Sequence, residues 1–129
     1  MRFSLITSLA LATALAACQT TTMEPEAVAP STATRLETQS DMAAITGKML
    51  VLEAGKSYVI GADGTIRGTW DGAPLVGAYE MRDGFFCRTL SQGPGGPSGE
   101  DCQILTLDGD KLMGNRNRGD WASFTLNVM

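Results

Sequence analysis

The sequence predicts a small all-β domain, and three observations predict it. Four Asp-Gly dipeptides, at residues 63–64, 71–72, 83–84 and 108–109, separate short apolar runs. Glycine accepts the positive φ of a tight hairpin turn, and aspartate tolerates it better than most residues. Apolar and polar residues alternate within the runs, as with Ile66 and Trp70 against Arg67 and Thr69. The runs are also short and regularly spaced, which is typical of an antiparallel meander.

We expect eight short strands, at residues 48–53, 56–61, 65–70, 75–81, 85–90, 103–107, 111–115 and 121–128. Such a meander either curls into a small barrel or folds over as two packed sheets, and the sequence leaves both open. The barrel-like form is favoured because glycines inside strands allow the bends that closure needs. These glycines are Gly61, Gly68, Gly77 and Gly114.

Two segments outside the strands have their own signals. Before the first strand, Ser40 or Asp41 can cap a short helical turn through residues 42–45, which Gly47 then ends. The longest connection, residues 91–101, is rich in glycine and proline and is expected to be a mobile surface loop. It is not expected to bind a nucleotide, because another strand follows it and it lacks the terminal lysine of a P-loop.

The N-terminal residues have a pattern that is typical of a targeting segment. Arg2 is followed by an uncharged apolar stretch, residues 3–14, and then by Leu15-Ala16-Ala17-Cys18. This pattern resembles the lipobox of bacterial lipoproteins. The resemblance implies that residues 1–17 are a signal peptide, that Cys18 becomes the acylated first residue, and that the protein lies on the periplasmic face of the outer membrane, because Gln19 is not an aspartate. The alternative is an ordinary secretory signal that leaves Cys18 as a free thiol.

Residues 18–37 are predicted to be a disordered tether, and residues 38–129 to be the β domain. The tether consists largely of Thr, Ala, Pro and Glu, and this composition buries too little apolar surface to offset chain entropy.

Cysteine usage predicts one disulfide. With Cys18 committed to lipid, Cys87 and Cys102 remain as an even number in an exported protein. Closing a loop of about fifteen residues contributes roughly 3 kcal/mol in the chain-entropy model. Two free thiols are the alternative.

Composition argues against most enzyme classes. The chain has no histidine, which removes the usual general base near neutral pH and imidazole metal sites. The close acidic pairs, Glu100 with Asp101 and Asp108 with Asp110, flank turns and are expected to be solvated. The net charge of −4 gives no basic surface for nucleic acid. We therefore expect no enzymatic activity, no cofactor, no metal and no nucleic-acid partner.

Arginines and aromatic residues supply the candidate ligand contacts. The favoured interpretation of Arg67, Arg82, Arg88, Arg116 and Arg118 is a set of solvated, outward-facing side chains paired with nearby acids. If neighbouring strands bring some of them together, guanidinium groups bind carboxylates or phosphates in a two-pronged geometry. The candidate contacts are Arg67, Arg88, Arg116, Trp70 and Trp121.

Three short motifs, Gly68-Thr69-Trp70, Gly84-Phe85-Phe86-Cys87-Arg88 and Asp101-Cys102-Gln103, are similar to those of a group of small exported bacterial proteins. The resemblance spans about residues 47–126 and implies the disulfide and a compact β domain, but no established activity. Some members carry the label dihydrodipicolinate reductase. This chain lacks a Gly-x-Gly-x-x-Gly fingerprint after a first strand and has no room for a dinucleotide domain.

Together these features predict a lipid-anchored periplasmic envelope module with a binding or structural role, whose partner is an envelope protein or a small ligand. One alternative is a lipocalin-like carrier of a small apolar or anionic ligand, which needs a cavity of about 300 Å³ or more. A second alternative is a small envelope enzyme, which needs a cleft with a perturbed carboxylate.

Overall fold

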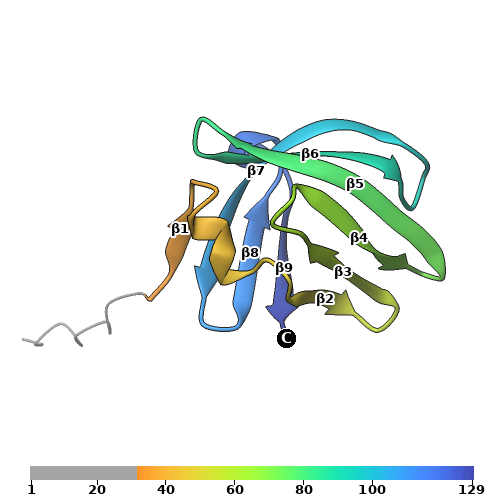
Figure 1. The fold of residues 1–129 in the computed structure, drawn as a ribbon, viewed down its shortest axis with the longest axis horizontal. Coiled ribbons are helices and arrows are strands. Elements are labelled where there is room, and N and C mark those ends of the chain that lie inside the picture. The colour runs from red at the N-terminus through yellow and green to blue at the C-terminus, as the bar shows by residue number, and fades with distance from the viewer. Residues whose placement is uncertain (1–31) are drawn as a thin grey trace, which may run out of the picture.

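After the first strand, consecutive strands pair in antiparallel fashion, as the spacing of the turns predicts (Figure 1). The computed structural model describes residues 32–129, so the predicted signal peptide, Cys18 and most of the predicted tether lie outside the described residues. The strands are β1 (Thr34–Leu36), β2 (Met49–Glu53), β3 (Lys56–Ile60), β4 (Thr65–Trp70), β5 (Ala73–Arg82), β6 (Phe85–Gln92), β7 (Ser98–Asp108), β8 (Lys111–Asn115) and β9 (Ser123–Val128). The predicted all-β class is confirmed.

The sheet closes into an eight-stranded barrel, the form that the sequence favoured over a sandwich. Strand order runs from β7 back to β2 and then to β9 and β8, and β8 pairs with β7 to complete the ring. The seam that closes the barrel, between β2 and β9, is short: Leu50 is opposite Val128 and Val51 is opposite Asn127. Closure leaves these eight strands without a free sheet edge along the seam.

The Asp-Gly pairs lie at the turns between strands, as predicted. At Asp71-Gly72 and at Asp83-Gly84 both residues have positive φ, between 51° and 83°. Each pair forms a two-residue loop, joining β4 to β5 and β5 to β6. Positive φ at both central positions is the geometry of the type I′ turn, which matches the twist of the strands it joins.

Two glycines inside strands allow the barrel to close, because they lie where the backbones of neighbouring strands come close together. A Cβ atom added at Gly68 would overlap the Ser57 carbonyl oxygen and the Tyr58 backbone of the neighbouring strand β3. One added at Gly77 would overlap the Thr89 carbonyl oxygen of β6. These contacts explain the predicted need for glycine at both positions.

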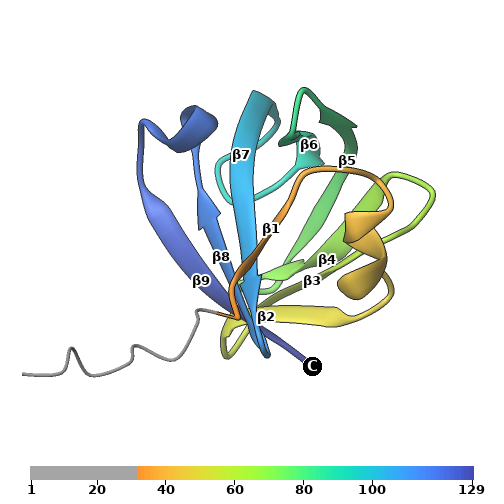
Figure 2. The same cartoon turned by 90° about the vertical axis from the view of Figure 1, so that its left-hand side faces the viewer.

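A short 3-10 helix, η1 (Asp41–Ala44), fills one end of the barrel. Met42 and Ile45 have no exposed surface and form part of the core. Figure 2 looks at this end and shows η1 and β1 in front of the strands. The predicted helical turn is therefore confirmed, but Ser40 makes no side-chain cap; Asp41 instead accepts hydrogen bonds from the Glu37 and Thr38 amides, both at 2.9 Å. No helix in residues 32–129 is long and apolar enough to cross a bilayer.

Strand β1 corrects the predicted end of the tether. Residues 34–36 were expected to be disordered, yet they pair with β7, with Leu36 opposite Leu105. The reason is a vacant edge: β6 pairs with β7 only up to Gln103, so the following residues of β7 need another partner on that side. Leu36 is buried by this pairing.

The predicted mobile loop at residues 91–101 is also wrong. Strand β6 continues to Gln92 and β7 begins at Ser98, so the turn is limited to residues 93–97. Leu90 is opposite Ser98, which shows that the ladder continues into the glycine-rich segment. Tertiary pairing overrides the weak strand propensity of this composition.

Gly68→Ala tests the closure geometry. We expect the variant to lose about 1–3 kcal/mol of unfolding free energy, because the new methyl group forces β3 and β4 apart. Urea denaturation followed by circular dichroism measures the loss. Gly99→Ala is the matched control, because an added Cβ at Gly99 meets nothing within 4 Å; equal stability of the two variants would contradict the expectation.

Candidate ligand-binding site

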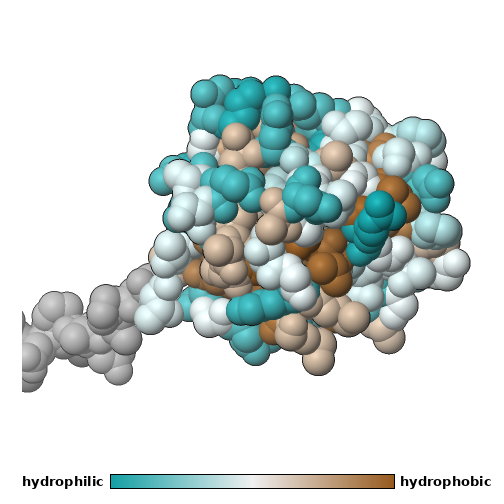
Figure 3. Space-filling model, viewed as in Figure 1, coloured by the Kyte–Doolittle hydropathy of each residue, from teal (hydrophilic) through white to brown (hydrophobic). Residues whose placement is uncertain are grey.

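A cavity of about 310 Å³ opens at the end of the barrel opposite η1. The turns β2–β3, β4–β5 and β6–β7 gather at this end, on the right of Figure 1, whereas η1 and β1 lie on the left. In Figure 3 hydrophobic side chains reach the surface in the right half of the same view. The apolar part of the wall consists of Leu52, Trp70, Leu75, Leu90, Phe124 and Leu126. Four polar residues, Tyr58, Arg88, Arg116 and Ser123, also line the cavity, and Pro94 and Ala122 complete its lining.

Arg88 is the charged group placed deepest in this environment. It lies on β6 between Phe86 and Leu90, both buried, and strand alternation directs all three side chains to the barrel interior. The Arg88 Nε atom is buried without a hydrogen-bond partner among the described residues. Burial lowers the pKa of Arg88, because desolvation disfavours the charged form. The guanidinium remains positively charged at neutral pH.

Tyr58 contributes a hydroxyl group to the same cavity. Its side chain is buried, and burial raises the pKa of Tyr58 to about 12, while the charge of Arg88 acts in the opposite direction. The hydroxyl is therefore protonated at neutral pH and can donate a hydrogen bond. Gly68 lies opposite Tyr58 on the adjacent strand, where an added Cβ would overlap the Tyr58 backbone.

A polar network stands at the rim. Asp101 accepts hydrogen bonds from Arg116 Nε at 2.8 Å, Gln103 Nε2 at 2.7 Å and the Asn117 amide at 3.0 Å. Burial opposes ionisation of Asp101, but these three hydrogen bonds and the charge of Arg116 outweigh it and hold the pKa below its ordinary value. The Arg116 guanidinium also lies 4.5 Å from the ring centroid of Trp121.

The structure brings together three of the five predicted ligand contacts. Trp70, Arg88 and Arg116 line the cavity, and Trp121 lies at the rim against Arg116 with 63% of its surface exposed. Arg67 is on the outer face of β4 and contributes nothing to the cavity.

Two interpretations of charged residues need correction. Arg88 does not point outward as a solvated side chain, because the period of two on β6 places it between two apolar residues. Asp101 is not solvated as the acidic-pair argument assumed, since only 14% of its side chain is exposed. Arg82 does follow the expected pattern and pairs with Glu80 at 3.0 Å on the surface.

Sequence reasoning missed Tyr58 and Asp101 as parts of the site. The spacing Phe86-x-Arg88-x-Leu90 carried a usable signal for the inward face of β6. No such signal marks Tyr58, because an inward aromatic residue is more often part of the core.

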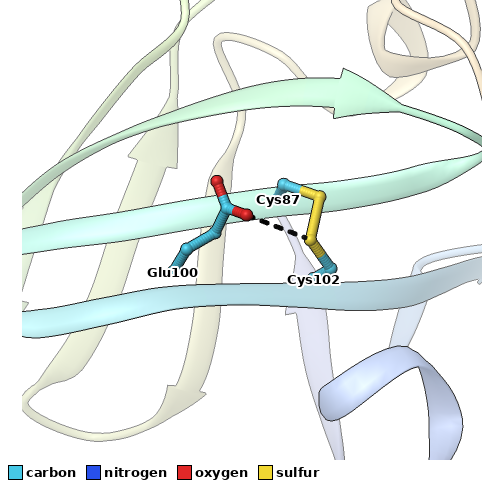
Figure 4. A group of neighbouring side chains, drawn as sticks. All are labelled: Cys87, Glu100 and Cys102. Carbon is cyan, nitrogen blue, oxygen red and sulfur yellow. Dashed lines mark hydrogen bonds between the residues drawn. A yellow bond between two sulfur atoms is a disulfide. The ribbon is translucent and has the colours of Figure 1, made fainter.

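The predicted Cys87–Cys102 disulfide is confirmed (Figure 4), and neither cysteine lines the cavity. The two cysteines are directly opposite each other on β6 and β7. With Glu100 they form a group of three donors whose ligand atoms lie within 4.8 Å of one another. Because the two sulfurs are bonded to each other, neither is the thiolate that binds metal. We assign the group to cross-linking of the sheet.

The arrangement is suited to binding. Its wall offers apolar surface, and its polar side chains supply hydrogen-bond donors from hydroxyl and guanidinium groups. Comparison with protein-family models, curated proteins and solved structures finds no match to this chain.

The stability of the Asp101→Asn variant, measured as a function of pH, tests the rim network. Because the folded-state pKa of Asp101 is lowered, its contribution to stability is present above the unfolded pKa of about 4 and disappears as the pH falls through the folded value. At pH 7 we expect the variant to be about 1–3 kcal/mol less stable. Below pH 4 the difference should shrink, as measured by urea denaturation across pH.

Asp110→Asn is the control for this measurement. The Asp110 side chain is 74% exposed, and its ion pair with Lys111 is long at 3.8 Å. Its replacement should change stability by less than about 0.5 kcal/mol. A pH-independent loss in Asp101→Asn would contradict the role assigned to its charge.

Proposed function

We propose that this protein is a lipid-anchored envelope module that binds a small amphipathic ligand in the mouth of its barrel. The observation that carries the proposal is the cavity of about 310 Å³ with a mainly apolar wall. Ligand sites typically have volumes from about 300 to 1,000 Å³, apolar walls and a few polar groups that orient the ligand. The sequence analysis gave a lipocalin-like carrier as an alternative function, and the cavity supports this version of the proposal.

The packing of the two barrel ends supports a role in binding. At the η1 end, Met42 and Ile45 are fully buried in the core. At the mouth, Trp70 and Leu52 remain partly exposed although both belong to the apolar wall. Apolar surface left exposed at a concave site is stabilised when a ligand removes it from water, by about 25 cal/mol per Å².

The cavity opens at the end of the barrel that is away from the first described residue, and this arrangement is compatible with an anchor at the N-terminus. At the start of the described residues, the Thr32 hydroxyl donates to Asp108 at the β7–β8 turn, away from the mouth. Thr32, the first described residue, therefore lies at the far end of the barrel from the cavity. If Cys18 carries the anchor, the mouth need not face the membrane and can receive ligands from the periplasm.

Binding of a neutral fluorescent probe tests the cavity. We expect N-phenyl-1-naphthylamine to gain fluorescence with the protein and Leu52→Glu to weaken its binding at least about tenfold, because a carboxylate on the apolar wall loses hydration when the ligand enters. Fluorescence titration gives the Kd. Met49→Glu, on the outward face of the same strand, is the control, since Met49 is already 50% exposed. No probe binding, or equal effects of the two variants, would refute the cavity as the binding site.

Mass spectrometry of the protein isolated from bacterial envelopes tests the anchor. We expect the mature chain to begin at Cys18 with acyl groups attached, because two or more chains are needed for firm membrane binding. Cys18→Ser should abolish the acyl mass and release the protein from the membrane fraction. An unacylated chain that begins at another residue would contradict this part of the proposal and leave the cavity untouched.

A further inference from the structure

We infer that the ligand is a monoanion, a carboxylate with a short apolar tail, and that the Arg88 guanidinium holds its head group. This inference rests on the proposed binding function and specifies the chemistry of the same cavity. No other cation of the described domain is placed in this way.

Arg88 carries a charge that the rest of the described domain leaves unpaired. The ion pairs within residues 32–129 involve Arg35, Lys56, Arg82, Lys111 and Arg116, and Arg88 is absent from them. Its Nε atom is both buried and without a partner. A buried, uncompensated charge is strongly destabilising, so an anionic ligand that pairs with it has a large interaction to gain.

The nearest protein carboxylate is already committed to other donors. Asp101 is opposite Arg88 in the register of β6 and β7, which is where a structural ion pair would form. Its oxygens instead accept hydrogen bonds from Arg116, Gln103 and the Asn117 amide. The donors of Arg88 are thus left for a molecule from outside the domain.

The charge balance specifies one negative charge. Arg116 forms an ion pair with Asp101, whose charge also favours the charged form of Arg88, so two cations share one carboxylate and one positive charge remains in excess at the cavity. A carboxylate matches it in charge, and it fits the guanidinium fork. A phosphate dianion would bring a second negative charge with no cation to receive it, close to the ionised Asp101.

The remaining groups specify the rest of the ligand. The protonated Tyr58 hydroxyl supplies a neutral donor in the same cavity. Leu52, Trp70 and Phe124 form an apolar wall for the tail. The cavity of about 310 Å³ is at the lower end of the range of about 300 to 1,000 Å³ that is typical of ligand sites, which favours a short tail. Octanoate has this size and chemistry.

Competition with the bound neutral probe provides the test, using the full chain with Cys18→Ser so that neither acyl groups nor detergent compete. Octanoate, 1-octanol and octyl phosphate are titrated separately at pH 8. We expect octanoate to bind at least tenfold more tightly than 1-octanol, a difference of about 1.4 kcal/mol. Octyl phosphate should bind more weakly than octanoate.

Arg88→Met and Arg67→Met form a matched pair of variants. Arg88→Met should lose at least tenfold in octanoate affinity and keep its 1-octanol affinity within about threefold, whereas Arg67→Met should match the parent chain for both. Circular dichroism reports whether each variant folds. If Arg88→Met does not fold, the comparison of octanoate with 1-octanol on the parent chain still decides the question.

The outcomes separate the two proposals. Equal affinities for octanoate and 1-octanol, or an unchanged octanoate affinity in Arg88→Met, would overturn the anion site and leave the binding function standing. Tighter binding of octyl phosphate than of octanoate would overturn the assignment to a monoanion. A protein that binds neither the probe nor any octyl compound would overturn the binding function and this inference with it.

Discussion

Closure of the sheet between β2 and β9 is the constraint on which the rest of the structure depends. The seam has only two register pairs, Leu50 with Val128 and Val51 with Asn127. Backbone hydrogen bonds between Met49 and Met129 lie beside these pairs and extend the seam. Once it forms, the inward side chains of eight strands share one interior, and each must fill space or border a cavity. Met42 of η1 and the adjacent Ile45 are fully buried at one end, whereas side chains at the other end border a cavity of about 310 Å³.

The unpaired Arg88 is costly for a domain of this size. A small domain is stable by only about 5–15 kcal/mol, and buried ionic groups are often replaceable by apolar residues with a gain in stability. A methionine or leucine at position 88 would continue the apolar face formed by Phe86 and Leu90. The cationic residue therefore conflicts with the local packing pattern, and such conflicts are concentrated at functional sites.

The Asp101 network separates the two arginines of the cavity into different roles. Arg116 is held by Asp101 and lies against Trp121, so its position at the rim is fixed by contacts within the domain. Arg88 forms no ion pair, and its Nε atom has no hydrogen-bond partner among the described residues, although the charge of Asp101 favours its charged form. The same carboxylate thus organises the rim and leaves the inner guanidinium with its donors free, which makes the site preorganised for an anion.

The sequence by itself determined the strand pattern, the turns and the cross-link, because these depend on local chemistry: alternation of polarity, positive φ at Asp-Gly pairs, and the two cysteines that remain once Cys18 is assigned to the predicted lipid anchor. Tertiary structure alone decided the rest. Three residues at Thr34–Leu36 are too few for a periodic signal, and they became a strand because β7 had a vacant edge. The segment at residues 91–101 joined the ladder in spite of its glycines. The choice of barrel over sandwich, the cavity, and the competition between Arg88 and Arg116 for Asp101 arise from contacts between distant strands, which local spacing does not encode.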